Sequence, residues 1–163
     1  MKHDERMEIV RVDKENYHLF DDMVFFRMHG RRKTTEEKKH PCDAAQIHKA
    51  LENPNLFVYA AQCEDQFCAW ISLLHMPKIG RTHGKGYIYI DELWTAEEHR
   101  RKGIARRLME KADELSLALD ALGVRLYVGN PAAKALYESC GYTCDHEPIC
   151  FMEKERAQDH PNH

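Results

Sequence analysis

The sequence predicts a mixed α/β fold of the α+β kind, with one mostly antiparallel central sheet of about seven strands flanked by about four helices. Three apolar runs, 56–62, 67–76 and 86–95, follow one another with short polar connections, which is typical of antiparallel strands. Residues 101–122 then place apolar side chains three or four apart, the period of an amphipathic helix. Residues 124–128 read as a further strand, so this strand-helix-strand unit is expected to be right-handed and locally parallel.

The N-terminal third predicts one strand and two helices. Residues 7–13 alternate loosely between apolar and polar side chains and predict the first strand. Residues 17–32 carry apolar side chains at helical spacing, and this helix is expected to end near Gly30. A charged stretch, 31–41, separates it from a second helix over residues 43–51.

Glycine and proline residues indicate where the helices of the C-terminal third begin and end. The long amphipathic helix is expected to begin near Arg101 and to stop at Gly123. A short helix over residues 131–140 has a proline in its first turn and Gly141 just past its end, which is the usual asymmetry of helix termini.

Two closing strands complete the predicted sheet. They are expected at residues 142–144 and 149–153, which gives the element order βααβββαβαββ. No internal repeat or linker interrupts the pattern, so residues 1–155 are expected to form a single domain, followed by a polar tail at 156–163.

Composition excludes several classes of protein. The chain has 163 residues, 43% of them hydrophobic and 31% charged, with a formal net charge of -3, as expected for a soluble globular protein. Basic residues form no dominant face, which disfavours nucleic acid as a partner. The N-terminus is charged where a secretory signal is apolar, and no apolar run is long enough for a membrane span. We therefore expect a cytoplasmic protein that does not enter a membrane.

The pattern of cysteines and histidines does not favour a metal site. The six cysteines include no Cys-x-x-Cys pair, and the eleven histidines include no His-x-x-x-His or His-Glu-x-x-His pattern. Without an export signal, the thiols are expected to be free and reduced. The sequence thus predicts no bound metal.

A basic, glycine-containing loop opens the long helix. Its residues are Arg100, Arg101, Lys102, Gly103, Ile104 and Ala105. Unpaired backbone N–H groups and the positive end of the helix dipole would meet three cationic side chains there, which suits a pyrophosphate. Gly103 lets the backbone approach a ligand closely because it has no Cβ. Taken alone, the loop could instead be a basic surface turn with a glycine.

With a second motif, the sequence resembles the GCN5-related N-acetyltransferase (GNAT) superfamily. The family signature is Gln or Arg, two residues, Gly, one residue, then Gly or Ala, and the loop that begins at Arg100 matches it. The family also has an Asn at the end of the next strand and a Tyr seven residues later, which match Asn130 and Tyr137. The specific matches lie between about Tyr87 and Tyr142, whereas the N-terminal third matches only as a pattern.

The resemblance implies how the chain would bind acetyl-CoA as a cosubstrate. Backbone N–H groups from Arg101 to Arg106 would hold the pyrophosphate, and the strand edge at Leu93, Trp94 and Thr95 would pair with the pantetheine amides. The family strands splay apart between residues 86–95 and 124–128, where the thioester would enter.

The resemblance also implies the catalytic groups. Tyr137 would be the general acid that protonates the departing thiolate, since a phenol with an ordinary pKa near 10 is protonated at neutral pH. A strand carboxylate would deprotonate the amine through water, and Asp91 is the first choice because it shares a strand face with Tyr89. A β-bulge would reverse this assignment in favour of Glu92. Both carboxylates could instead be solvated groups at a strand end, and Tyr137 could simply pack on its helix.

Other functions stay open at this point. The domain could bind acyl-CoA as an inactive regulator, or the basic loop could belong to a nucleotide- or nucleic-acid-binding module. Within the enzyme class, the acceptor amine could be a small molecule or a peptide, and the acyl group could be longer than acetyl. Family members often dimerise, so a homodimer is a further expectation from the resemblance.

Overall fold

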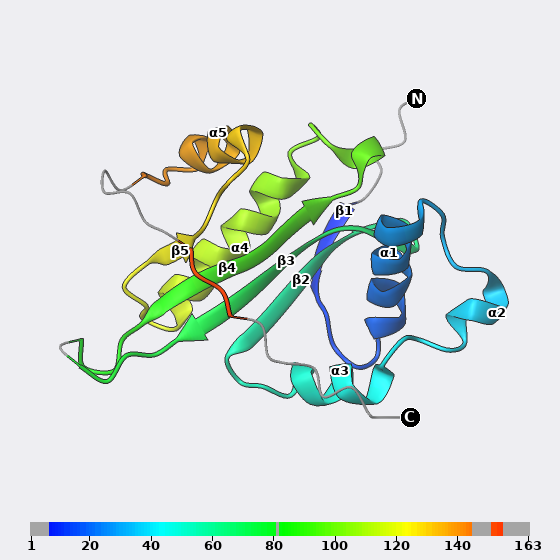
Figure 1. Ribbon diagram of the computed structural model, residues 1–163, viewed down its shortest axis with the longest axis horizontal. Helices are drawn as coiled ribbons and strands as arrows, with labels where there is room; N and C mark the ends of the chain where they lie inside the picture. The colour runs from blue at the N-terminus through cyan, green and yellow to red at the C-terminus, as the bar shows by residue number, and fades with distance from the viewer. Residues whose placement is uncertain (1–6, 81, 145–150, 155–163) are drawn as a thin grey trace.

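The computed structural model describes residues 7–80, 82–144 and 151–154, and within these ranges one mixed sheet forms the centre of the protein (Figure 1). Five strands lie in the order β1-β2-β3-β4-β5. Neighbours are antiparallel except for the last pair, β4 and β5, which is parallel. The mixed, mostly antiparallel α/β fold and its parallel unit are confirmed. The strands are β1 (Met7–Arg11), β2 (Leu56–Cys63), β3 (Gln66–Met76), β4 (Tyr87–Thr95) and β5 (Val124–Leu126).

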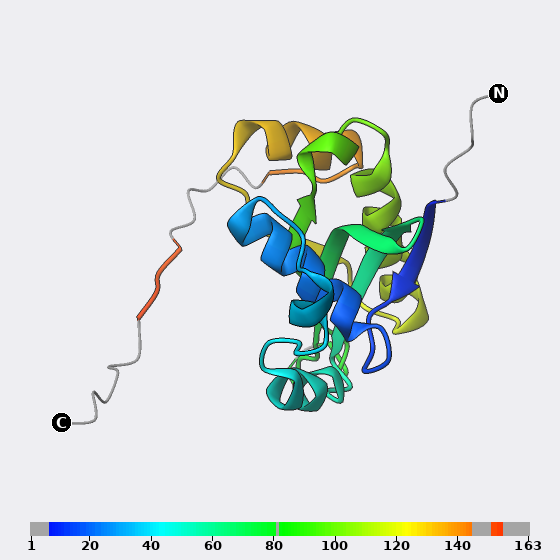
Figure 2. The same cartoon turned by 90° about the vertical axis from the view of Figure 1, so that its right-hand side faces the viewer.

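Helices cover both faces of the sheet. Seen from the side, α1 and α4 lie on opposite faces (Figure 2). The helices are α1 (Tyr17–His29), α2 (Thr35–Lys38), α3 (Ala44–Leu51), α4 (Ile104–Ala118) and α5 (Pro131–Ser139), with one 3₁₀ turn, η1 (Glu97–His99). Within the described ranges, no helix is both long and apolar enough to cross a membrane.

Two apolar clusters fill the spaces between the layers. The cluster under α4 includes Ile71, Ile88 and Leu108, each fully buried. The cluster under α1 is built around Met23 and Trp70. Neighbouring residues of a strand that lie outside a β-bulge, such as Trp70 and Ile71 of β3, contribute to opposite clusters, as the two-residue period of a strand requires. Apolar side chains therefore cover the sheet on both faces.

The first helix ends where the sequence predicts. Gly30 adopts a left-handed φ of 71°, and its N–H donates to the carbonyl of Phe26 at 2.8 Å. The short helix α2 was not predicted. Thr34 and Glu37 form a reciprocal capping box there, because the Thr34 side chain accepts from the Glu37 N–H and the Glu37 carboxylate accepts from the Thr34 N–H. The Thr-x-x-Glu pattern was the signal that could have revealed it.

The long helix is shorter than predicted at both ends. It begins at Ile104 because Arg101 and Gly103 have left-handed φ angles of 61° and 80°, which no α-helix contains. It ends at Ala118 rather than near Gly123, since Asp120 takes a left-handed φ of 50°. The N–H of the next residue, Ala121, then donates to Ser116 at 2.9 Å, which closes the helix end in a Schellman-type arrangement with Asp in place of Gly.

The prediction of two closing strands is wrong for the residues that can be judged. Residues 142–144 and 151–153 form no strand, and 149–150 lie outside the described residues. Tyr142 packs its ring beside Tyr137, with 6.0 Å between ring centroids, so this apolar side chain is buried by α5 and not by strand pairing. Phe151 and Met152 are 69% and 86% exposed and contribute nothing to the core.

Candidate functional site

The predicted phosphate loop lies between β4 and α4. After η1, the chain passes through Arg100 in an extended conformation and then takes left-handed φ angles at Arg101 and Gly103. Gly103 is the residue that caps the N-terminus of α4. Alternation of left-handed and ordinary backbone turns successive N–H groups toward one side, the arrangement known as an anion nest. A Cβ built on Gly103 would meet nothing within 4 Å, so open space lies beside this turn.

The loop presents a run of unpaired donors. The backbone N–H groups of residues 101–106 have no acceptor within the described part of the chain. The first pairing at this end of the helix is that of the Arg107 N–H with the carbonyl of Gly103, at 3.2 Å. A helix N-terminus leaves such groups for solvent or for a ligand, and its dipole favours a negative charge. The geometry therefore suits a phosphate or pyrophosphate.

Basic side chains surround this turn, but two of them are already engaged. The Arg100 Nε donates to the carbonyl of Thr95 at 3.1 Å, which ties the loop to the end of β4. Arg106 donates to the hydroxyl and the carbonyl of Ser139 at 2.9 and 3.3 Å, which ties α4 to the end of α5. Arg101 and Lys102 are exposed, and neither forms an ion pair with another residue in the described ranges. The two exposed cations are free to approach an anion.

One edge of β4 is open next to the loop. The parallel strand β5 pairs with β4 only at Ile88, Tyr89 and Ile90. From Asp91 to Thr95, β4 has no strand partner on that side among the residues described. The sheet therefore has an unpaired strand edge beside Leu93, Trp94 and Thr95, the three residues predicted to pair with pantetheine, although the Thr95 carbonyl already accepts from Arg100.

A β-bulge lies at the two candidate carboxylates. Ser72 of β3 pairs with Glu92, and the next residue, Leu73, pairs with Ile90, so Asp91 is the extra residue. The bulge changes the phase of the strand, because Ile90 and Leu93 both belong to the cluster under α4 although they are three residues apart. Glu92 therefore lies on the α1 face, which Tyr89 shares.

Contacts on that face support this placement. The Glu92 carboxylate lies 3.6 Å from the guanidinium of Arg27, in the last turn of α1. The same guanidinium lies 5.3 and 5.9 Å from the ring centroids of Trp70 and Trp94. Sequence reasoning missed Arg27, because no local pattern distinguishes it from other basic residues of a helix end.

Tyr89 has an aromatic neighbour that the sequence analysis also missed. Its ring lies 5.8 Å from that of Tyr127, just past the end of β5. The pKa of Tyr89 is raised, first by its interaction with Tyr127 and then by burial. Tyr127 follows an expected strand and is aromatic, which was the available signal.

Tyr137 is half-buried on α5. It packs against the cluster under α4, and burial raises the pKa of its phenol above the ordinary value. A raised pKa keeps the hydroxyl protonated through the neutral range, which a proton donor needs. The phenol of the neighbouring Tyr142 is buried without a hydrogen-bond partner in the described structure, and burial raises its pKa as well.

Asn130 has a structural role that the geometry makes plain. Its side-chain oxygen accepts from the N–H of Ala132 at 2.9 Å, so it caps α5 and Pro131 occupies the first helical position. It thereby sets the start of the helix that carries Tyr137. Figure 1 shows α5 beside the N-terminal half of α4, near the loop and the end of β4. Glu92 contacts α1 and therefore lies on the other face of the sheet.

Comparison with known proteins places the chain among acetyltransferases. The family model for the acetyltransferase (GNAT) family matches residues 20–142. None of the curated proteins matches the sequence closely enough to count as a relative.

Solved structures share the fold at low sequence identity. An aminoglycoside acetyltransferase from an uncultured soil metagenomic sample is similar with a TM-score of 0.73 and 20% identity, over 93% of this chain and 99% of that one. A ribosomal-protein-alanine N-acetyltransferase from Brucella melitensis biovar Abortus 2308 has a TM-score of 0.67 and 14% identity, over 91% and 100% of the two chains. The family model covers well over half of the sequence, and the chain therefore belongs to the acetyltransferase (GNAT) family.

Proposed function

We propose that the protein is an N-acetyltransferase that moves an acetyl group from acetyl-CoA to a primary amine by direct attack of the amine on the thioester. The observation that carries the proposal is the run of acceptor-free N–H groups over residues 101–106, formed by the left-handed turns at Arg101 and Gly103. A pyrophosphate supplies several acceptor oxygens and negative charge, which these groups and the dipole of α4 would satisfy together.

The neighbouring residues fit the remainder of the donor. The exposed side chains of Arg101 and Lys102 would add positive charge next to the phosphates. The unpaired edge of β4 at Leu93, Trp94 and Thr95 would hydrogen-bond the amides of pantetheine, in the way that an added strand completes a sheet. N–H groups of the same edge would stabilise negative charge on the thioester oxygen during attack.

Glu92 is the residue we assign to deprotonate the amine, through a water molecule. The bulge at Asp91 turns Glu92 onto the α1 face with Tyr89 and leaves its carboxylate half-exposed beside Arg27. An ammonium group has to lose a proton before its nitrogen can attack, so a carboxylate that can reach it through water raises the rate. A contact of 3.6 Å to Arg27 orients the carboxylate without enclosing it.

Tyr137 is the residue we assign to protonate the departing thiolate. Its raised pKa keeps the proton on the phenol until the sulfur develops charge. The cap at Asn130 and the link from Arg106 to Ser139 hold both ends of α5, so the position of the phenol relative to α4 is fixed.

The acceptor is proposed as a small-molecule or peptide amine. Similar folds belong to acetyltransferases named for aminoglycosides and for a ribosomal-protein alanine. The exposed carboxylates of Asp91 and Glu92 suit a positively charged amine near the strand end.

A binding experiment followed by a turnover screen tests the proposal. Saturation with CoA or acetyl-CoA is expected to raise the melting temperature, since a ligand at a hundredfold excess over its Kd stabilises the folded state by about 2.7 kcal/mol. Thiol release from acetyl-CoA is then followed with aminoglycosides, polyamines and peptides that begin with alanine. If neither acetyl-CoA nor CoA raises the melting temperature, the proposal is rejected. Stabilisation without turnover on any amine would favour an inactive acyl-CoA-binding regulator instead.

A further inference from the structure

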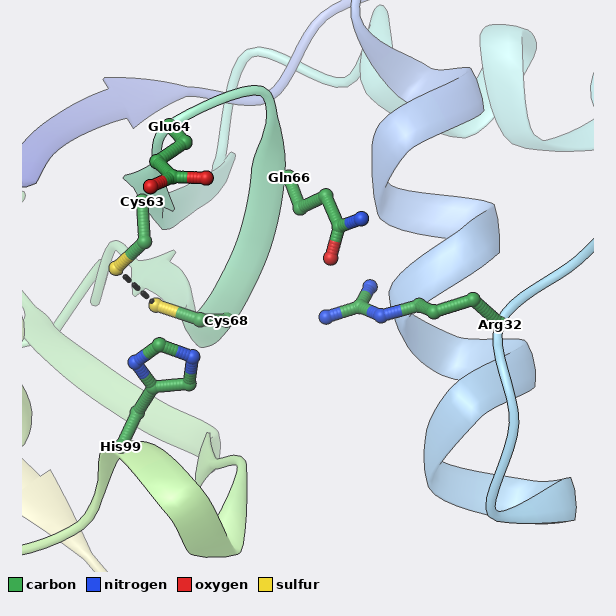
Figure 3. Close-up of a pocket in the computed structure, with 6 residues that line it drawn as sticks. All are labelled: Arg32, Cys63, Glu64, Gln66, Cys68 and His99. Carbon is green, nitrogen blue, oxygen red and sulfur yellow. Dashed lines mark hydrogen bonds between the residues drawn. The ribbon is translucent and has the colours of Figure 1, made fainter.

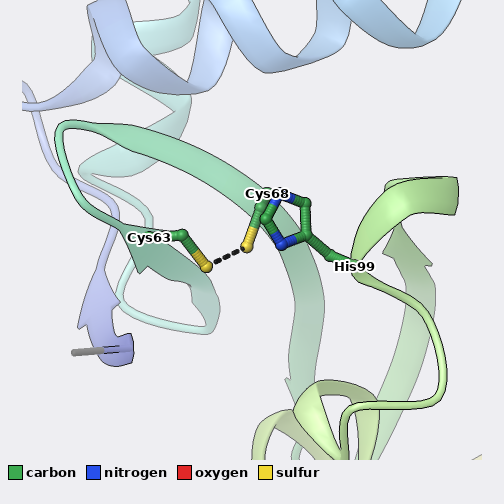
Figure 4. Close-up of side chains that lie close together, drawn as sticks. All are labelled: Cys63, Cys68 and His99. Carbon is green, nitrogen blue, oxygen red and sulfur yellow. Dashed lines mark hydrogen bonds between the residues drawn. The ribbon is translucent and has the colours of Figure 1, made fainter. Parts of the chain in front are cut away.

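Two thiols and an imidazole meet beside η1, the turn that precedes the phosphate loop. Cys63 lies at the end of β2, Cys68 near the start of β3 and His99 at the end of η1. Their sulfur and ring nitrogen atoms all lie within 4.8 Å of one another, and the two sulfur atoms are 2.8 Å apart. Figure 4 shows the edge of the His99 ring turned toward both sulfur atoms.

The backbone brings these residues together by an irregularity of the hairpin. Gln62 pairs with Phe67 and Ala61 pairs with Ala69, so Cys68 is the extra residue of a β-bulge. Cys68 is thereby turned to the same face as Ala69 and toward Cys63. The N–H of Ala96, which precedes η1, donates to the carbonyl of Cys68 at 2.9 Å and places His99 over the thiols.

The imidazole has a buried nitrogen that nothing in the described structure satisfies. The Nδ1 of His99 is shielded from solvent and has no hydrogen-bond partner among these residues. Buried polar atoms in folded proteins are almost always paired, so an orphan of this kind indicates a group that the chain itself does not supply. Figure 4 shows that this nitrogen, next to the ring carbon that carries the side chain, is the one turned toward the Cys68 sulfur atom.

A cavity of about 170 Å³ adjoins the cluster (Figure 3). Besides the three residues already named, Arg32, Glu64 and Gln66 line it. The guanidinium of Arg32 is already occupied, since it donates to the Asp22 carboxylate at 3.2 Å and to the carbonyl of Phe67 at 2.8 Å. The cavity leaves room for a water molecule next to the thiols, and the Glu64 side chain adds negative charge to its wall.

We propose that Cys63, Cys68 and His99 bind one Zn²⁺ ion, with a water molecule from the cavity as the fourth ligand. Two thiolates and one imidazole are a donor set that zinc prefers, in a tetrahedral arrangement. Binding replaces the S–H bond of each cysteine by a Zn–S bond, and the two protons leave to solvent. Zn–S bonds of about 2.3 Å require the sulfur atoms to separate to about 3.8 Å, which half-buried Cys63 at the hairpin end can provide.

A disulfide between Cys63 and Cys68 is the competing use of the same atoms. It would join the two sulfur atoms but leave the Nδ1 of His99 buried and unpaired. Zinc satisfies all three groups at once, and the observations favour it for this reason. The proposed site departs from the expectation of no metal, which rested on the lack of Cys-x-x-Cys, His-x-x-x-His and His-Glu-x-x-His spacing. Here the bulged hairpin, and not a short loop, brings the two cysteines together.

Zinc at this position would cross-link the β2–β3 hairpin to η1. His99 directly precedes Arg100, the first residue of the phosphate loop, so the ion would fix the start of that loop. Metal binding itself does not depend on the proposed acetyl transfer, and the two proposals can fail separately.

Cobalt titration tests the site with a spectroscopic readout. Full-length protein is stripped with a chelator under reducing conditions and titrated with Co²⁺ and then with Zn²⁺. We compare Cys63→Ser and His99→Gln with Cys42→Ser, which removes an exposed cysteine elsewhere. Cys68 is left unchanged because it is buried. Circular dichroism melting shows that each variant is folded.

Wild type and Cys42→Ser are expected to bind one Co²⁺ with a thiolate-to-cobalt charge-transfer absorption that Zn²⁺ removes. Cys63→Ser and His99→Gln are expected to bind Zn²⁺ at least about tenfold more weakly, because loss of even an outer-shell group costs that much. Absence of the charge-transfer band at saturating Co²⁺ would overturn the proposal. Equal Zn²⁺ affinity in all four proteins would also overturn it, as would a Cys63–Cys68 disulfide that persists in a glutathione buffer with excess Zn²⁺.

Discussion

The Glu92 carboxylate lies 3.6 Å from the guanidinium of Arg27, so the last turn of α1 contacts the bulged end of β4. Asp91, the residue beside Glu92, occupies the extra position of the bulge. Only one of two adjacent carboxylates is therefore placed on the face that α1 covers. This difference makes the two residues separable by experiment.

Glu92→Gln is expected to lower kcat/KM for acetyl transfer by about a hundredfold or more, the usual contribution of a general base. The amide keeps the size of the side chain but cannot accept the proton from the amine. Steady-state kinetics of thiol release measure the change. Asp91→Asn is the matched control and is expected to change kcat/KM much less. A larger loss of kcat/KM in Asp91→Asn than in Glu92→Gln would show that Asp91 is the general base.

Tyr137→Phe is expected to lower kcat about a hundredfold and to leave the Kd of CoA unchanged, because the hydroxyl acts on the leaving group and not on the phosphates. The raised pKa of Tyr137 also sets a sign for the pH profile. Activity that needs the protonated phenol is kept as pH rises past neutrality and is lost only above the ordinary tyrosine pKa of about 10.

Tyr142→Phe is the control for this substitution, since the two rings are neighbours with centroids 6.0 Å apart. The Tyr142 hydroxyl is buried and has no partner among the described residues. Its removal is expected to keep kcat and to raise the free energy of unfolding by about 1 kcal/mol, the low end of the cost of an unsatisfied buried group. Equal kcat losses in both variants would show that Tyr137 acts only through packing.

Gly103→Ala is expected to weaken CoA binding about tenfold and to lower stability by about 1–2 kcal/mol. The φ of 80° at Gly103 strains any residue with a Cβ, and the loop can relax only by disturbing its N–H groups. Isothermal titration with CoA and urea denaturation measure the two effects. Gly80→Ala is the control, because a Cβ there also meets nothing within 4 Å and Gly80 has no left-handed φ. Unchanged CoA affinity in Gly103→Ala would contradict the assignment of the loop.

Glu37 is expected to contribute a pH-dependent part of the stability of α2. Hydrogen bonds first from Arg31 and then from the Thr34 backbone lower the pKa of this carboxyl to about 2. A lowered pKa in the folded state means that the stabilisation is present above the ordinary pKa of about 4.3 and is lost as pH falls toward 2.

The measurement is the melting temperature of wild type and Glu37→Gln at pH values from 7 to 2. Wild type is expected to be the more stable protein at neutral pH, and the difference is expected to disappear near pH 2. The effect is small and falls with added salt because the group is exposed. Glu36→Gln, which removes only an exposed pair with Lys39, is expected to show no such convergence.

Local chemistry explains what could be predicted of the site. The loop from Arg100 to Ala105 follows a strand and opens a helix, and the structure forms the turn at that place. Asn130 and Pro131 begin a helix through their own capping and φ preferences, which act over two or three residues. Preferences that act over so few residues can be recognised in a single sequence.

Features that depend on pairing between distant segments were not predictable. The bulge at Asp91 exists because β3 and β4 pair in different registers on its two sides. No residue of β4 indicates this change of register in the sequence. The bulge at Cys68 has the same origin and brings two cysteines and His99 together without any metal motif. The prediction of two closing strands was wrong for a related reason, because Tyr142 packs against Tyr137 and not against a neighbouring strand.

The sequence by itself determined the mixed sheet, the parallel unit around α4, the helix ends at Gly30 and Asn130, and the glycine turn at Gly103. Each follows from periodicity or from the backbone preference of one residue, and both act over a few positions. Tertiary structure alone decided which carboxylate faces α1 and where the Cys63 and Cys68 thiols meet His99. Those outcomes depend on the register of strands far apart in the chain, and a shift of one residue moves every following side chain to the opposite face.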